Sequence, residues 1–132
     1  KNDYPAARNI NTVTQALAPL SALGINGGMD YEKVESARLL SSSEYTLNPT
    51  LGYISLKSAL ASDEVLGVAY EYTYNGKVYQ VGEFSADIST TDQSLYLKML
   101  KSTTINPKLP MWDLMMKNVY SLGAYQISKL SA

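Results

Sequence analysis

The chain of 132 residues contains no cysteine and no histidine, and it has only one tryptophan and one phenylalanine. Without cysteine there is no disulfide and no thiolate nucleophile. Without either residue type, Cys/His zinc sites and histidine-dependent catalytic triads are excluded as well. Because only disulfides would have indicated an oxidising compartment, the redox compartment stays open on this criterion.

Long hydrophobic runs are also absent. No stretch approaches the roughly 20 consecutive apolar residues that a membrane helix requires, and no signal peptide is visible. A net charge of −1 provides no electrostatic footprint for nucleic acid. The chain begins at Lys1 without methionine, so we interpret it as a piece of a longer protein. We expect no membrane span in this piece and no nucleic-acid partner.

The sequence is instead rich in tyrosine, with eleven residues, and its content of 45% hydrophobic and 17% charged residues is typical of a globular protein. We predict one globular domain, with a linker and helix over residues 1–29 and a β-rich part over residues 30–132. Residues 1–92 carry a net charge of −5 and residues 93–132 one of +4. We interpret these charges as solvated faces of one sheet, and a docking polarity for a partner is the alternative.

A β-hairpin is the clearest local prediction. Two runs rich in Val and Tyr flank Asn75-Gly76, and a type I′ turn needs positive φ at both of its central residues, which Asn and Gly tolerate best. Such a turn also determines the register of the strands. The predicted cross-strand pairs are Tyr74 with Lys77, Tyr72 with Tyr79, Tyr70 with Val81 and Gly67 with Phe84.

This register gathers tyrosines on one face of the hairpin. We interpret them as rings that pack across strands while their hydroxyls reach water at a sheet margin. The alternative is a flat aromatic platform for a sugar or a peptide. With a tryptophan from a later helix, the residues of this possible interaction surface are Tyr70, Tyr72, Tyr74, Tyr79 and Trp112.

The segment before the hairpin predicts an imperfect N-terminal helix. Thr12 with Gln15 resembles a capping box, Pro19 should kink or split the helix, and Gly24 is suited to end it in the left-handed conformation. Further strands are predicted over residues 31–40, 45–47, 51–56, 95–101 and 124–128.

A second helix is predicted over about residues 110–118, because Pro110 favours a first helical turn. Its residues Trp112, Met115, Met116 and Val119 follow helical spacing, which we interpret as a cover over the sheet rather than a ligand box. The residues predicted to serve turns and structure are Asn75, Gly76, Pro49, Pro110 and Gly123.

Acidic residues are the remaining candidates for catalysis. A glycosidase needs two carboxyl groups about 5 to 10 Å apart in one cleft, but the hairpin register places Glu71 and Glu83 on opposite faces. The other candidate carboxylates are those of Asp63, Glu64 and Asp113, and residues 63–64 and 87–92 lack the ligand spacing of a calcium loop. We therefore expect no enzymatic activity, no catalytic residue, no metal and no cofactor.

Three strings carry a resemblance to a known family. They are ESARLLSSSEYTLNPTLGYISLKSAL (35–60), DEVLGVAYEYTYNGKVYQVGEFS (63–85), and LYLKMLK with LPMWDLMMKNVYSLGAYQISK (95–101 and 109–129). They resemble segments of the SprA/Sov family, very large outer-membrane proteins associated with gliding motility and the type IX secretion system. The resemblance implies a soluble, non-catalytic segment of a protein-secretion translocon, associated with the outer membrane and extracytoplasmic.

Together these observations predict a mainly β fold with minor α, namely an antiparallel sandwich or twisted sheet with an N-terminal helix and one short helix packed on it. We expect a structural or protein-interaction role. The partners implied by the resemblance are other translocon segments, accessory secretion proteins or secreted cargo. The alternative function is a cell-surface carbohydrate-binding or adhesive module that uses the tyrosines.

Overall fold

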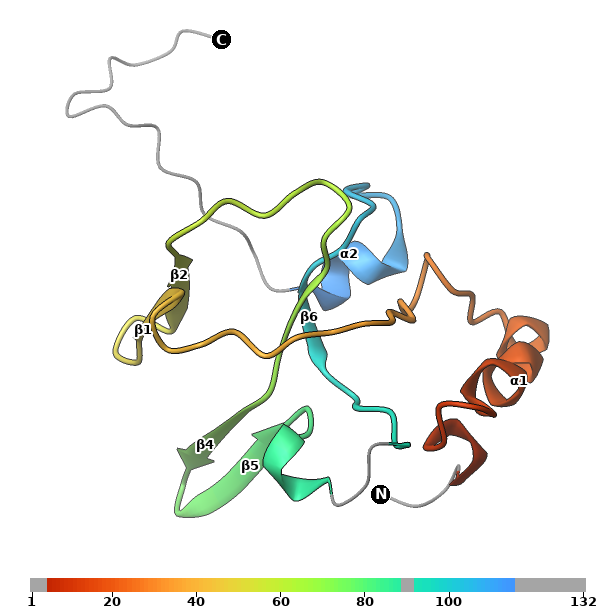
Figure 1. Ribbon diagram of the computed structural model, residues 1–132, viewed down its shortest axis with the longest axis horizontal. Helices are drawn as coiled ribbons and strands as arrows, with labels where there is room; N and C mark the ends of the chain where they lie inside the picture. Colours follow the sequence, from red (N-terminus) through yellow and green to blue (C-terminus); the bar gives the residue numbers. More distant parts are fainter. Residues whose placement is uncertain (1–4, 89–91, 116–132) are drawn as a thin grey trace, which may run out of the picture.

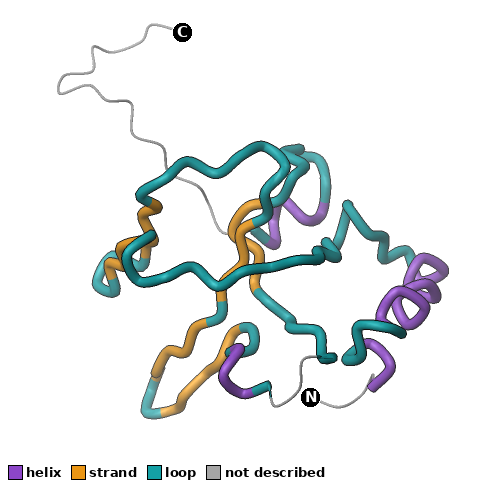
Figure 2. The backbone as a smooth tube through the Cα atoms, in the orientation of Figure 1, coloured by secondary structure: helices purple, strands orange, loops and turns teal. Residues whose placement is uncertain are grey.

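The computed structural model describes residues 5–88 and 92–115. Its elements alternate with long irregular connections, as Figures 1 and 2 show. In chain order they are η1 (Pro5–Ala7), α1 (Val13–Leu17), η2 (Ala18–Leu23), β1 (Tyr45–Asn48), β2 (Tyr53–Leu56), β3 (Leu66–Val68), β4 (Tyr70–Tyr74), β5 (Lys77–Val81), η3 (Ser85–Asp87), β6 (Lys98–Lys101) and α2 (Pro110–Leu114).

The strands of the described residues form three antiparallel sheets of two strands each. The pairs are β1 with β2, β3 with β6, and β4 with β5. The predicted class, mainly β with minor α, is confirmed. The strands pair two by two, whereas the sequence had suggested one sandwich or one twisted sheet. In Figure 1, α1 and the β1–β2 hairpin lie at opposite sides of the molecule, with β6 between them.

The β4–β5 hairpin is confirmed at its turn. Asn75 has a φ of 50° and Gly76 a φ of 72°, so both central residues take the left-handed conformation that a type I′ turn requires. The observed register pairs Tyr74 with Lys77, Tyr72 with Tyr79, and Tyr70 with Val81, as predicted.

The predicted pairing of Gly67 with Phe84 is wrong. Gly82 takes a φ of 73°, which turns the chain away from the hairpin, and a Cβ there would lie 3.0 Å from the carbonyl oxygen of Val68. Gly67 instead pairs with Met99 of β6, next to a register shift. The predicted strand over residues 95–101 is accordingly shorter and covers β6 alone.

Two predictions for the middle of the chain have opposite outcomes. The turn that includes Pro49 is confirmed, since β1 and β2 pair across it and the Asn48 side chain accepts a hydrogen bond from the Leu51 amide at 2.9 Å.

The predicted strand over residues 31–40 is wrong. Ser36 takes a φ of 57° there, and the neighbouring side chains are exposed, so this stretch lacks a regular strand backbone and a buried face.

The N-terminal helix is split as predicted. Pro19 lies in the first turn of η2, which directly follows α1, and Gly24 ends η2 with a φ of 79°. The predicted capping box is wrong, because Thr12 has helical backbone angles and makes no cap hydrogen bond. Its hydroxyl donates instead to the carbonyl oxygen of Ala6 at 2.7 Å and ties α1 to η1.

The second helix begins at Pro110 as predicted but ends earlier. The backbone of Met115 is already extended, with a ψ of 148°, so α2 spans residues 110–114 and not 110–118. Met111 is only 1% exposed, and its amide donates to the carbonyl oxygen of Met29 at 2.8 Å. Met116, Val119, Gly123 and the predicted strand over residues 124–128 lie outside the described residues.

The core of the described residues is small. The buried apolar side chains are Ala7, Val13, Met111 and Met115. Eighteen large hydrophobic side chains are exposed, and they occur in every part of the described chain, from Ile10 to Leu114. Burial of apolar area is the main source of folding free energy. Because these side chains are exposed, most of the apolar surface contributes little to the stability of the fold.

Candidate interaction surface

The predicted tyrosine surface forms on the β4–β5 hairpin. Tyr72 and Tyr79 are cross-strand partners, and their rings stack with centroids 5.2 Å apart and planes 16° apart. The ring of Tyr70 lies 6.2 Å from that of Tyr72, tilted by 34°. Tyr72 is 46% exposed and Tyr79 is 40% exposed. The rings therefore pack across the two strands, as predicted, and both residues stay partly exposed to water.

The other two predicted surface residues are placed differently. Tyr74 adjoins the turn and is more exposed than the stacked pair. Trp112 belongs to α2, which lies in the upper half of the molecule in Figure 1, whereas the β4–β5 hairpin lies at the bottom. The structure therefore brings Tyr70, Tyr72 and Tyr79 together and leaves Trp112 outside their surface.

The two glutamates of the hairpin region have separate environments. Glu71 is exposed on β4, whereas the carboxylate of Glu83 is half-buried and held by the guanidinium of Arg8. A carboxylate in such an ion pair is stabilised in its charged form, which suits an anchor better than a general acid.

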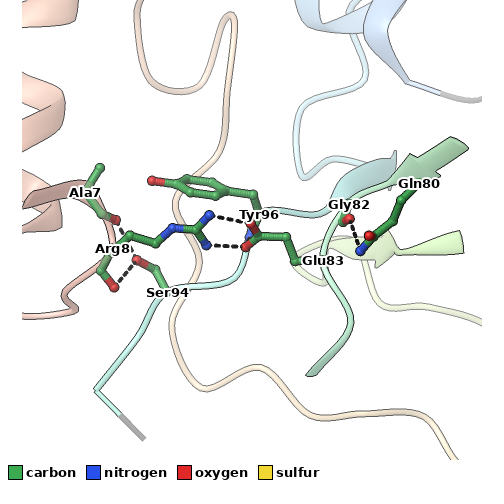
Figure 3. Close-up of polar contacts among 7 residues, drawn as sticks. All are labelled: Ala7, Arg8, Gln80, Gly82, Glu83, Ser94 and Tyr96. Carbon is green, nitrogen blue, oxygen red and sulfur yellow. Dashed lines mark hydrogen bonds and ion pairs between the residues drawn. The ribbon is translucent and has the colours of Figure 1, made fainter. Parts of the chain in front are cut away.

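Arg8 and Glu83 form the main polar contact between distant parts of the chain (Figure 3). Nη1 and Nη2 of Arg8 each donate to one carboxylate oxygen of Glu83, at 2.5 Å. The guanidinium carbon lies 4.7 Å from the centre of the Tyr96 ring, a cation–π contact, and the Tyr96 amide donates to Glu83 at 3.2 Å. The hydrogen bond with Glu83, more than any other effect, raises the pKa of Arg8 above its ordinary value.

Backbone and hydroxyl groups extend this contact. The amide of Ser94 donates to the Arg8 carbonyl oxygen at 2.7 Å, and the amide of Ile10 donates to the Asp92 carbonyl oxygen at 3.0 Å. The hydroxyl of Ser94 reaches the carbonyl oxygens of Ala7, at 2.6 Å, and Arg8, at 3.0 Å. We call this set of contacts, between residues 7–10 and residues 83 and 92–96, the arginine latch.

The latch was missed by sequence reasoning. Arg8 and Glu83 are 75 positions apart, so neither helical spacing nor strand alternation relates them. A weak signal was present, because Gly82 next to Glu83 could have been interpreted as the end of the hairpin rather than as part of its ladder.

Glu32 forms a second polar contact between distant parts of the chain. Glu32 accepts hydrogen bonds from the hydroxyls of Ser102, at 2.7 Å, and Thr103, at 2.8 Å, which ties the middle of the chain to the end of β6. Near it, an open hollow of about 310 Å³ is lined by Thr14, Leu17, Gly27, Gly28, Tyr31, Glu32 and Lys33.

Glu44 holds the exposed loop before β1. The Arg38 guanidinium, together with the amide and hydroxyl of Ser41, lowers the pKa of Glu44 to about 2. The Arg38 hydrogen bond is the largest cause, because a positive donor stabilises the charged carboxylate most strongly.

Comparison with protein-family models, with curated proteins and with solved structures found no match to this chain. Within residues 5–88 and 92–115, no helix has the length and apolar character needed to cross a bilayer. In the same part of the chain, no cluster of three or more acidic side chains is arranged to hold a metal ion.

Proposed function

We propose that this chain is a non-catalytic, protein-binding structural segment of an outer-membrane translocon of the type IX secretion class. The observation that carries the proposal is how few apolar side chains are buried. Among the described residues, eighteen large hydrophobic side chains are exposed and four apolar side chains are buried. Surface of this kind is typical of a segment that is completed by other protein. The setting in a translocon is supported by the resemblance of residues 35–60, 63–85, 95–101 and 109–129 to the SprA/Sov family.

The β4–β5 hairpin is the best candidate for the surface that meets other protein. A two-stranded hairpin alone is at best marginally stable in water, so contact with a further element would stabilise it. Tyrosine is enriched at protein interfaces, because its ring buries apolar area while its hydroxyl still bonds to water or a partner. The stacked rings of Tyr72 and Tyr79 give this surface a preformed centre.

In-cell crosslinking tests this proposal. A photoreactive residue at Tyr72 should crosslink to another translocon segment or to an accessory secretion protein, whereas the same residue at Glu71, on the other face of β4, should crosslink less. A companion strain lacking residues 63–85 should secrete less cargo at normal translocon levels. Cargo secretion that persists undiminished in that strain would overturn the proposal.

A second candidate is a carbohydrate-binding or adhesive module, which the exposure of the stacked tyrosines favours. A glycan array with the wild-type chain and with Tyr72→Ala separates the two functions. Saturable sugar binding that is lost in Tyr72→Ala favours this candidate. Tyr53→Ala, which removes a tyrosine of similar exposure from β2, is the matched control and should keep any binding.

A further inference from the structure

Residues 7–10 lie on the 92–94 segment in the manner of a bound peptide. Asn9 and Gln93 form an isolated antiparallel bridge, and the amides of Ile10 and Ser94 each donate to a carbonyl oxygen across it. A peptide segment that is bound in this way gains affinity from such backbone bonds and specificity from the sites that hold its side chains. Here the side chain that enters a built site is Arg8 (Figure 3).

We propose that Glu83, Ser94 and Tyr96 form a recognition site for an arginine-bearing peptide segment of a partner protein, and that residues 7–10 of this chain occupy it as a displaceable intramolecular ligand. This inference goes beyond the proposed secretion role and does not depend on it.

The chemistry of the site selects arginine over lysine. Two parallel hydrogen bonds join Nη1 and Nη2 to the two oxygens of Glu83, a geometry that only the planar guanidinium fork supplies. The ring of Tyr96 lies over the guanidinium carbon, and guanidinium planes stack on aromatic rings better than ammonium groups do. Lysine would keep the charge and lose the fork.

The residue before the arginine also bonds to the site. Ala7 is buried, and its carbonyl oxygen accepts the Ser94 hydroxyl at 2.6 Å, so this part of the ligand lies close to the site. The recognised pattern is therefore an arginine whose neighbours, one before it and two after it, bond through their backbones to residues 92–94.

The resident segment is suited to leave the site. The elements η1, α1 and η2 pack on one another, so this N-terminal unit has contacts of its own that do not involve the site. The latch contacts are polar and partly open to water, with Arg8 24% exposed and Glu83 15% exposed. Water and a competing peptide can replace such bonds one at a time, and the apolar side chain uncovered when residues 7–10 leave is the small one of Ala7.

The test uses the full chain and a fluorescent peptide, PAARNINT, which has the sequence of residues 5–12. The variant Arg8→Glu places two carboxylates together and should expel the resident segment. Fluorescence anisotropy should then show at least tenfold tighter peptide binding by Arg8→Glu than by the wild type. A peptide with lysine in place of its arginine should bind at least fivefold more weakly to Arg8→Glu.

The matched control is the double variant Arg8→Glu/Glu83→Arg, which restores an ion pair within the chain and should lose the gained peptide affinity. Equal binding by Arg8→Glu and the wild type, or equal binding of the arginine and lysine peptides, would overturn the inference.

A second measurement covers the case in which Arg8→Glu does not fold. Excess PAARNINT peptide added to the wild-type chain should shift the NMR amide signals of Ile10, Ser94 and Tyr96 and leave those of β1 and β2 unchanged. The lysine peptide should have a smaller effect at the same concentration. Absence of shifts at residues 10, 94 and 96 with the arginine peptide, or equal shifts with both peptides, would likewise overturn the inference.

Discussion

The β4–β5 hairpin and the arginine latch are two opposite kinds of structure within one chain. The hairpin is built from neighbours in sequence, and its register follows from the backbone angles of Asn75 and Gly76. The latch joins residues 75 positions apart through a carboxylate, a guanidinium and an aromatic ring. Local backbone chemistry therefore determines the first region, and long-range polar complementarity determines the second.

The hairpin and the latch are also stabilised by different interactions. Two paired strands with exposed tyrosines bury little apolar area, so the hairpin depends on its turn. The latch depends on the side chains of Arg8, Glu83, Ser94 and Tyr96 and on a few backbone bonds. Substitutions should consequently disrupt one region and leave the other intact.

The largest effect is expected at the turn. Gly76→Val should destabilise the β4–β5 hairpin by about 2 kcal/mol, because a β-branched residue is strained at a φ of 72°. Hydrogen exchange of the amides of β4 and β5 measures the loss. Gly76→Asn is the control and should cost much less, since Asn tolerates this conformation. If the amide of Ser94 lost protection to the same extent, the two regions would not be independent.

Gly82 connects the two regions and is expected to have the next largest effect. Gly82→Ala should cost more than about 1 kcal/mol, because the new Cβ would meet the Val68 carbonyl oxygen at a φ unfavourable for alanine. Thermal unfolding gives the value. Gly24→Ala, at a similar φ but in open space, is the control for strain alone and should cost less. Equal losses would show that crowding at residue 82 has no role.

Removal of the latch charge is expected to have a moderate effect. Arg8→Ala should weaken attachment of the N-terminal unit by about 1 kcal/mol, since a partly exposed ion pair is screened by solvent. The exchange rate of the Ser94 amide should rise, and that of the hairpin amides should not. Arg8→Lys should recover only part of the protection. Full recovery by lysine would contradict the role of the guanidinium fork.

Stacking of the tyrosines is expected to contribute less. A double-mutant cycle with Tyr72→Ala and Tyr79→Ala should give a coupling free energy of about 0.5 kcal/mol in favour of the pair, as is typical of cross-strand aromatic contacts. Urea unfolding of the four proteins provides the measurement. The pair Tyr72 and Tyr53, which lie on different sheets, is the control and should show no coupling.

The smallest effect is local and depends on pH. The folded-state pKa of Glu44 is near 2 and the ordinary value is 4.5, so its contribution to stability is complete above about pH 4.5 and is lost as the pH falls toward 2. NMR titration of the Glu44 carboxyl carbon measures this pKa. Arg38→Ala should raise it toward the ordinary value, while the latch and the hairpin stay unchanged. An unaltered pKa in that variant would refute the assigned cause.

The fold was predictable where one residue dictates the backbone. Asn75-Gly76, the split at Pro19 and the turn at Pro49 are of this kind, because Asn-Gly tolerates the positive φ of a tight turn and Pro fixes φ, with little dependence on the surroundings. The predicted strand over residues 31–40 failed because its alternation of apolar and polar residues was loose. Ser36 has a positive φ, but neither glycine nor asparagine stands at this position to indicate it in the sequence.

The candidate site was predictable only in part. The stacking of Tyr72 on Tyr79 followed from the register, since directly opposite residues on a strand pair meet. The Arg8–Glu83 pair did not follow from any pattern, because the chain passes through long irregular connections between the two residues. The prediction for Glu83 also required the β4–β5 strand pairing to continue past Gly82. The pairing ends before Gly82, so Glu83 does not lie on a face of the hairpin.

The long separation in sequence between Arg8 and Glu83 affects the order in which parts of the chain fold during synthesis. A hairpin closes within about 1–10 μs of its residues becoming available, whereas a ribosome adds roughly 5–20 residues per second. Arg8 therefore waits on the order of ten seconds after its own synthesis before Glu83 and Tyr96 emerge. During that interval the nascent N-terminal unit is not yet attached to the 92–96 segment, and the guanidinium of Arg8 can bind another acidic surface.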